Sequence, residues 1–188
     1  MSVQPGDLPA GMARCDLTGD IDSFLNKEKT ADPSTYNSTK ASWVDAKSKG
    51  ATAAYTAFYT DSSEHCKAIS SSSAAIGSAV YKLVVNFVIQ FKDEASAAKG
   101  YTTEKVFNVS ASDLKASASA LTASGQLVVE GTKTGLSANS IVLNSPIANQ
   151  SYYIAVWQNK AFLVILAILN VDPGAAKKVA TSENARIA

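Results

Sequence analysis

The chain has 188 residues and a formal net charge of +1, with its lysines and acidic residues interspersed. Nucleic acids and anionic membrane surfaces select proteins with a basic field, so this near-neutral charge argues against both kinds of partner. Charged residues make up 18% of the chain, below the usual quarter, and serine, threonine, alanine and asparagine take their place. The length predicts a single domain over residues 1–188.

The N-terminal part predicts an extended segment followed by two helices. Residues 1–19 form a lead-in punctuated by glycine and proline. Asp20 is placed to cap a short helix over 21–29, because an aspartate side chain accepts hydrogen bonds from the first free N–H groups. A second helix is predicted from about 34 to 49, with Gly50 in the position where helices end.

One pattern occurs three times: an apolar strand, an aspartate, and a helix rich in alanine, serine and lysine. The strands are predicted at 52–60, 80–91 and 161–171, and the aspartates that follow them are Asp61, Asp93 and Asp172. Each aspartate is a predicted N-cap. Glu64 would complete a capping box with Asp61, and Pro173 stands at a first helical position. The serine run 70–73 is predicted as a loop.

The C-terminal half predicts a strand meander. Its strands cover 126–130, 140–144, 151–157 and 161–171, with a hairpin turn at 158–160 and a final helix over 173–184. Between the helix that follows Asp93 and this meander, residues 105–125 are rich in serine and alanine, and we expect a weakly helical, mobile insertion there. Short loops make neighbouring strands antiparallel. The fold class is therefore α+β: one twisted antiparallel sheet of about six strands, with helices packed mainly on one face.

The chain has two cysteines, Cys15 and Cys66. If paired, they would tie the N-terminal segment to the helix after the first strand, and closing that loop would stabilise the fold by roughly 4 kcal/mol. Alternatively, they are two separate buried thiols that pack as small hydrophobic groups.

No motif in the chain carries catalytic chemistry. Ser112 and Lys115 have the Ser-x-x-Lys spacing of penicillin-recognising enzymes, but the later Lys-Thr-Gly at 133–135 is too close and a Ser-Asp-Asn element is missing. His65, the only histidine, precedes Cys66 directly, and neighbouring residues on a helix point apart. We expect His65 on the surface, and we expect no enzyme activity.

The acidic cluster near the N-terminus resembles a calcium loop only superficially. Asp16, Asp20 and Asp22 begin such a pattern, but Ile21 and Lys27 stand where an EF-hand needs glycine and glutamate. One histidine and two cysteines are too few for a zinc site without carboxylates. We therefore expect no metal site and no cofactor.

No segment is long and apolar enough to span a bilayer, since the longest apolar run covers only 161–169. The first five residues lack the basic start and apolar core of a signal peptide. Two interpretations remain open. The protein is cytoplasmic, or Met1 stands in place of a removed signal or lipoprotein leader that carried a lipid anchor.

Several short patterns together resemble bacterial extracytoplasmic lipoproteins and sensor-like domains. They are Leu8-Pro-Ala-Gly-Met12 followed by Cys15 and Thr18-Gly-Asp20, the strand–aspartate–helix phrase from Phe58 to Cys66, and the ending of meander, hairpin, apolar strand and helix. That group resembles the PsbP-like fold in its α/β/α form. The resemblance implies a location outside the cytoplasm, a Cys15–Cys66 disulfide and a binding or accessory role. It transfers no catalytic residue.

The leading functional hypothesis is a non-enzymatic extracytoplasmic domain that binds a partner protein or a small apolar ligand. Aromatic residues that could line a groove where a helix meets the sheet edge are Trp43, Tyr55, Tyr59, Tyr153 and Trp157. For the two tryptophans, the simpler interpretation is a core or core-edge position. The alternatives are a self-assembling structural surface protein and a hydrolase with an unrecognised carboxylate pair.

Overall fold

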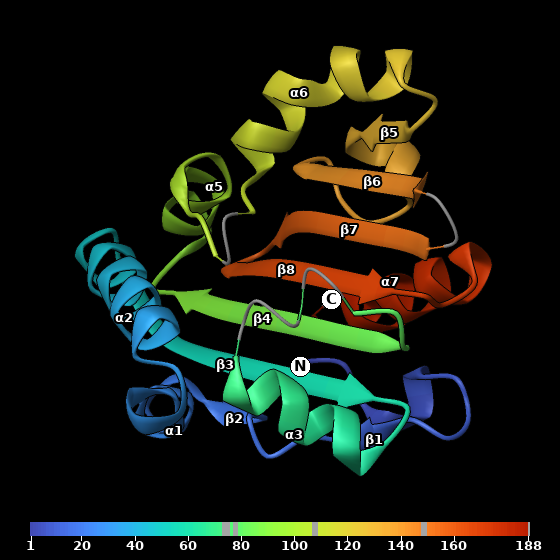
Figure 1. The fold of residues 1–188 in the computed structure, drawn as a ribbon. Helices are drawn as coiled ribbons and strands as arrows, with labels where there is room; N and C mark the ends of the chain where they lie inside the picture. The colour runs from blue at the N-terminus through green and yellow to red at the C-terminus, as the bar shows by residue number, and fades with distance from the viewer. Residues whose placement is uncertain (73–75, 77–78, 107–108, 148–149, 188) are drawn as a thin grey trace.

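The structure is a computed structural model that describes residues 1–72, 76, 79–106, 109–147 and 150–187 (Figure 1). Within this part of the chain, eight strands form one antiparallel sheet, and six α-helices pack against it. The predicted α+β class is confirmed, with two more strands than expected. The two additional strands are only two residues long each.

The strands are β1 Ala13–Arg14, β2 Gly19–Asp20, β3 Ala51–Thr60, β4 Leu83–Phe91, β5 Leu127–Glu130, β6 Ser140–Ile147, β7 Gln150–Asn159 and β8 Phe162–Leu169. The helices are α1 Ile21–Ala31, α2 Pro33–Ser48, α3 Ser63–Ser71, α5 Glu94–Thr103, α6 Ala111–Ala123 and α7 Pro173–Ile187, with 3₁₀ turns η1 Pro5–Asp7 and η2 Gly131–Thr134.

The strand order across the sheet is β1-β3-β4-β8-β7-β6-β5, and β2 also pairs with β3. The apolar strand β4 lies inside the sheet, between β3 and β8, with Val85 opposite Phe58 on one side and Ala167 on the other. Strands β5 to β8 form the predicted antiparallel meander. Burial on both faces explains why β4 and β8 are almost continuously apolar.

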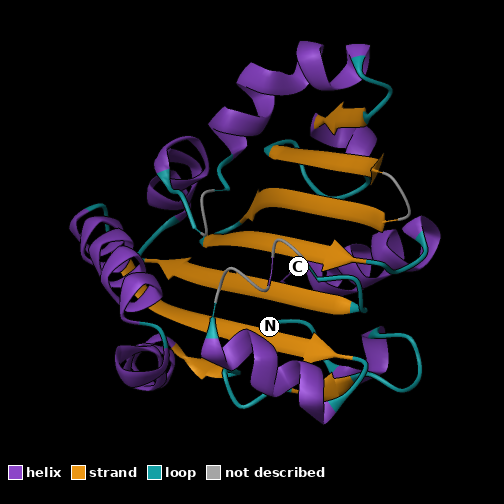
Figure 2. Ribbon diagram, in the orientation of Figure 1, coloured by secondary structure: helices purple, strands orange, loops and turns teal. Residues whose placement is uncertain are grey.

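Helices cover the two faces of the sheet unequally (Figure 2). The buried side chains of α1, α2, α3, α5 and α6 join one core cluster, in which Phe24, Phe58 and Phe87 pack ring against ring. The opposite face is covered by α7 and by the N-terminal segment, where Val3 is fully buried. The prediction that helices pack mainly on one face is confirmed, and α7 completes a third layer.

Helix caps follow the predicted pattern at three of the four aspartates. Asp20 accepts from the Ser23 N–H and Asp93 accepts from the Ser96 N–H. Asp172 accepts from the Ala175 N–H at the start of α7. These short-range contacts could be predicted because an N-cap needs only a residue type at a fixed spacing.

The predicted cap of α3 is wrong. Its N-cap is Ser62, which accepts from the His65 N–H, whereas Asp61 accepts from the Lys82 N–H and pairs with His65. The helix therefore begins one residue later than expected, and Glu64 is out of register for a capping box. The helix also runs through Ser71, so the predicted loop over 70–73 is wrong at Ser70 and Ser71, while position 73 lies outside the described residues.

Two segments with a weak sequence pattern, residues 1–19 and 105–125, contain regular secondary structure. The lead-in contains the turn η1 and the strand β1, which pairs with β3. Within 105–125, α6 forms a regular helix capped by Ser110, and its single buried residue is Ala111. The mobility expected for this segment stays a prediction, and residues 107–108 lie outside the described part.

Candidate functional site

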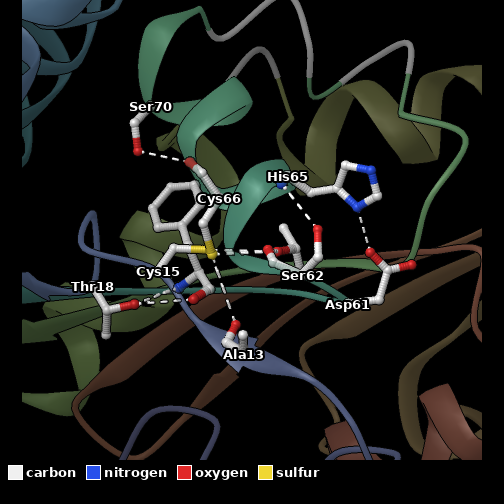
Figure 3. The surroundings of a disulfide bond; sticks show 10 residues. Ala13, Cys15, Thr18, Asp61, Ser62, His65, Cys66 and Ser70 are labelled. Carbon is white, nitrogen blue, oxygen red and sulfur yellow. Dashed lines mark hydrogen bonds and ion pairs between the residues drawn. A yellow bond between two sulfur atoms is a disulfide. The ribbon is translucent and has the colours of Figure 1, made fainter.

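A disulfide between Cys15 and Cys66 fastens the edge of the sheet, with a Cα–Cα distance of 5.1 Å (Figure 3). Cys15 follows β1, and Cys66 lies in α3. The Cys15 N–H also donates to the Phe58 carbonyl, and Thr18 Oγ1 exchanges hydrogen bonds with both backbone groups of Phe58. The predicted disulfide is confirmed, and it binds an irregular segment to both the sheet and a helix.

A groove of about 630 Å³ lies beside this disulfide. Helices α1 and α3 contribute its two sides, and the segment from Ala13 to Leu17 contributes the rest. Its volume falls within the range of ligand-binding clefts, roughly 300–1,000 Å³. The lining residues are Ala13, Arg14, Cys15, Asp16, Leu17, Lys27, Ala31, Ser63, Cys66, Lys67, Ser70 and Ser71. We call this the disulfide groove.

Three cationic side chains line the disulfide groove: Lys27, Lys67 and Arg14. Lys27 comes from α1 and donates to the Asp16 carbonyl, and Lys67 comes from α3 and forms no ion pair within the described residues. The Arg14 guanidinium also lines the groove and keeps its positive charge, although it donates to the neutral Tyr55 hydroxyl at 2.9 Å. Among the described lining residues, Asp16 is the only one with a carboxylate. The groove therefore combines buried apolar surface at Cys15 and Leu17 with a positive rim.

The serines of α3 add little hydrogen-bonding capacity to the groove. Ser70 Oγ donates to the Cys66 carbonyl, and Ser71 Oγ donates to the Lys67 carbonyl, so both hydroxyl protons are used within the helix. Ser63 lies in the first turn of α3 and is exposed. The polar groups that could select an occupant are thus the two lysines, Arg14 and the exposed Ser63.

Comparisons with known proteins give the chain no family. No protein-family model matches it, and no curated protein matches its sequence. Among solved structures, it resembles the extracellular domain of PknH from Mycobacterium tuberculosis, with 12% identity and a TM-score of 0.45. The aligned region covers 74% of this chain and 66% of that domain. So distant a similarity carries no functional argument.

A second groove, of about 470 Å³, lies where the N-terminal segment meets β3 and β4. Tyr55, Val88 and Phe162 line it together with Met1 and Gln4. Tyr55, one of the predicted aromatic residues, thus borders a ligand-sized space. Residues 2–7 form an N-terminal strap, and two of them, Ser2 and Gln4, line this groove. We therefore call it the strap groove.

The structure does not bring the five predicted aromatic residues together. Trp43 packs on α2 against the helix-rich core, with Lys47 Nζ 5.6 Å from its ring centroid. Tyr59 and Trp157 are buried on the opposite face, and the Tyr59 hydroxyl donates to the Val3 carbonyl. Tyr153 is buried on that face too and borders a smaller hollow of about 110 Å³. Ligand contact by these residues stays a prediction, while the core interpretation of Trp157 is confirmed.

Three buried carboxyl groups were not singled out from the sequence. One of them, Glu104, forms an ion pair with Lys49, and the other two have no ion pair within the described residues. Glu183 of α7 is fully buried, and burial raises its pKa to about 8. Glu28 of α1 is 2% exposed, and burial together with the nearby Asp32 raises its pKa to about 7. Both interrupt an otherwise apolar helix stripe: Glu183 lies between Ala180 and Ile187 in the buried residues of α7. That interruption is the sequence signal that could have revealed them.

His65 forms a side-chain pair with Asp61 at the start of α3. His65 Nδ1 lies 2.5 Å from Asp61 Oδ1, and its ring stacks on Tyr81 with centroids 3.8 Å apart. Cys66 next to it is consumed by the disulfide. Within the described residues no cluster of three metal-ligating side chains occurs, and none of the described helices has the length and hydropathy of a membrane span.

Proposed function

We propose that the protein is a non-enzymatic extracytoplasmic binding domain that holds an extended, acidic segment of a partner protein in the disulfide groove. The observation that carries this proposal is the pairing of Lys27 and Lys67, from two different helices, along an open groove with buried apolar groups. An extended peptide with acidic and apolar side chains would match both features. A small apolar ligand would leave the two ammonium groups unmatched.

The disulfide supports the extracytoplasmic location. Disulfides persist in oxidising compartments and are rare where thioredoxin and glutathione keep thiols reduced. The Cys15–Cys66 bond also fixes the segment Ala13–Leu17 relative to α3, so the groove is preorganised. Preorganisation reduces the entropy lost on binding. The resemblance of the sequence to extracytoplasmic lipoprotein and sensor-like domains points in the same direction and stays a hypothesis.

A displayed random-peptide library would test the proposal. The native protein is used for selection, and a Lys27→Glu/Lys67→Glu variant is used for counter-selection. We expect the enriched peptides to carry excess aspartate and glutamate and to bind the double variant at least tenfold more weakly, since each charge reversal replaces attraction by repulsion. Binding should also weaken with added salt.

Lys178→Glu is the matched control, because Lys178 is an exposed lysine on α7 and lies on the opposite face of the sheet. It changes the net charge without touching the groove. It is therefore compared with the single variants Lys27→Glu and Lys67→Glu, which change the net charge by the same amount. If Lys178→Glu weakens binding as much as either of them, the interaction is with the net charge. Enriched peptides without an acidic excess would also contradict the proposal.

One observation favours self-assembly as a second candidate function. Strand β5 pairs with β6 on one side only within the described residues, and its first residue, Leu127, is 58% exposed. Open strand edges can pair with other chains. Sedimentation velocity over a range of protein concentrations would test this: a constant monomer sedimentation coefficient would exclude it.

A further inference from the structure

The N-terminal strap, residues 2–7, is held on the sheet by polar contacts. The Val3 N–H donates to Asn86 Oδ1 in β4 at 3.2 Å, and the Tyr59 hydroxyl of β3 donates to the Val3 carbonyl at 3.1 Å. From α7, Arg186 binds Asp7 through two nitrogens, at 2.8 and 2.6 Å, and also donates to the Ser2 carbonyl. The strap therefore depends on three separate structural elements.

Glu183 lies beneath this set of contacts. Its carboxyl is fully buried, with Oε2 accepting from Asn86 Nδ2 at 3.2 Å and Oε1 without a hydrogen-bond partner in the described part of the chain. Asn86 thus contacts the strap through its side-chain oxygen and Glu183 through its side-chain nitrogen. Any change in the charge of Glu183 therefore acts directly on the Asn86 side chain, which accepts the hydrogen bond from the Val3 N–H.

The other groups around Glu183 are few. The titratable and charged ones are Arg186 on its own helix, Asp7 and the Met1 amino group from the N-terminal segment, and Tyr59 from β3. Strands β4 and β8 contain no titratable residue, and the only ones in β7 are Tyr152 and Tyr153. Arg186 is the one side chain among them with a permanent positive charge.

Arg186 has two carboxyl groups within its range. It now binds Asp7 on the strap, and Glu183 precedes it by three residues on the same helix, a spacing at which side chains are neighbours. While Glu183 is neutral, Asp7 is the stronger partner. An ionised Glu183 would compete for the guanidinium, and a buried carboxylate needs such a counter-ion.

We propose that Glu183 and Arg186 form a pH-dependent latch, which holds the N-terminal strap on the sheet while Glu183 is protonated and releases it when Glu183 ionises. In the opening step, the O–H bond of the Glu183 carboxyl breaks and its proton passes to solvent. Arg186 then moves from Asp7 and the Ser2 carbonyl to Glu183, and the hydrogen bonds of Val3 with Asn86 and Tyr59 break as water replaces them. Release of the strap opens the strap groove, because Ser2 and Gln4 form part of its lining beside Tyr55.

The position of the latch on the pH scale follows from burial. Desolvation raises the pKa of Glu183 to about 8, and it outweighs the opposing effects of the Asn86 hydrogen bond and the Arg186 charge. The latch is therefore closed in neutral and acidic solution and opens in mildly alkaline solution.

Hydrogen–deuterium exchange of the strap amides tests the latch. The native protein and Glu183→Gln are compared at the same pH values, so that the intrinsic pH dependence of exchange cancels. The glutamine side chain has nearly the same size as that of glutamate and cannot ionise. Between about pH 7 and about pH 9.5, we expect native strap amides to lose at least tenfold in protection relative to Glu183→Gln, since each pH unit above the pKa shifts the ionisation equilibrium tenfold.

Two further variants make the result decisive. Glu28→Gln removes another buried carboxyl with a raised pKa, on α1 and away from the strap, and should leave the strap response unchanged. Asp7→Asn removes the partner of Arg186 on the strap and should leave the strap poorly protected at every pH. Equal strap protection in native protein and Glu183→Gln at all pH values would overturn the proposal. So would loss of the response in Glu28→Gln.

Discussion

The two faces of the sheet are closed by different kinds of bond. On the face under α3, a disulfide holds the irregular segment after β1 to the helix, and its strength does not depend on a titrating group. On the face under α7, the N-terminal strap is held by hydrogen bonds and an ion pair around the buried Glu183. The first closure responds to the redox state of the surroundings and the second to pH. One chain can thus be sensitive to two chemical variables through separate regions.

The largest effect is expected from the core beneath α7. Trp157 is fully buried there, so Trp157→Ala should lower the free energy of unfolding by roughly 4 kcal/mol through lost burial and a cavity. Trp43 on the other face is only half-buried, and Trp43→Ala should cost clearly less. Urea titration of both variants, followed by far-UV circular dichroism, checks the ranking. Similar losses would mean that the two tryptophans are equally embedded.

Removal of the disulfide should have an effect of about the same size. Cys15→Ser/Cys66→Ser opens a loop with a sequence separation of 51, and the chain-entropy model predicts a loss of about 4 kcal/mol. The loss should be nearly the same at every pH, because no titrating group is removed. Urea unfolding of this variant across the pH range is the measurement. A loss that varies strongly with pH would contradict the separation of the two faces.

Stability should fall as the pH rises. In the unfolded chain Glu183 ionises near its ordinary pKa of 4.5, whereas in the folded protein it keeps its proton until about pH 8. Its contribution is therefore complete below about pH 4.5, is lost through this window and is constant above it. We expect a decrease of roughly 3 kcal/mol across the window, allowing for partial relaxation around the charge. Glu28 adds a decrease of the same sign that ends near pH 7.

Denaturant unfolding at a series of pH values measures this decrease directly. Glu183→Gln should flatten most of the curve, and Glu28→Gln should flatten its lower part. A stability curve that rises with pH over the same window would show that ion pairs of exposed carboxylates outweigh both buried groups.

The smallest effect is expected at the first turn of α3. Ser62→Ala removes the hydroxyl that accepts the His65 N–H and should cost about 1 kcal/mol, the usual cost of a lost N-cap. Asp61→Ala should leave this cap in place and instead free the Lys82 N–H. Comparing the helical circular dichroism and unfolding midpoints of the two variants distinguishes a cap from a loop contact.

Local rules predicted much of the fold. Capping aspartates, the stop at Gly50 and the short turns of the meander each depend on residues that are neighbours in sequence, so the order of elements followed directly. The cysteines themselves left pairing and separate thiols open, and the disulfide was implied by the resemblance to extracytoplasmic domains. Asp61 was misplaced because two adjacent residues, Asp61 and Ser62, could both cap the helix, and a tertiary contact with Lys82 took one of them.

The grooves could not be predicted in the same way. The disulfide groove depends on α1 and α3 meeting beside β1, and these elements are far apart in the sequence. The strap contacts join Asp7 to Arg186, a separation of 179 residues. The aromatic residues of the sequence suggested Trp157 as a ligand contact, but it is buried in the core. The polar residues Asn86 and Glu183 stand within apolar patterns and bind each other, so they are better indicators of a functional position. A polar residue in a buried pattern needs a partner, and the partner is set by the tertiary fold.

The order of strands has a consequence for synthesis of the protein. Strand β4 is complete at Phe91, but its second neighbour, β8, begins only at Phe162. A nascent chain on the ribosome therefore carries a long apolar strand with one unpaired edge until the residues between these two strands have been added. Exposed edges of this kind pair readily with other chains. The incomplete chain should thus be prone to pairing with other chains during that interval, even though the finished sheet has β4 paired on both sides.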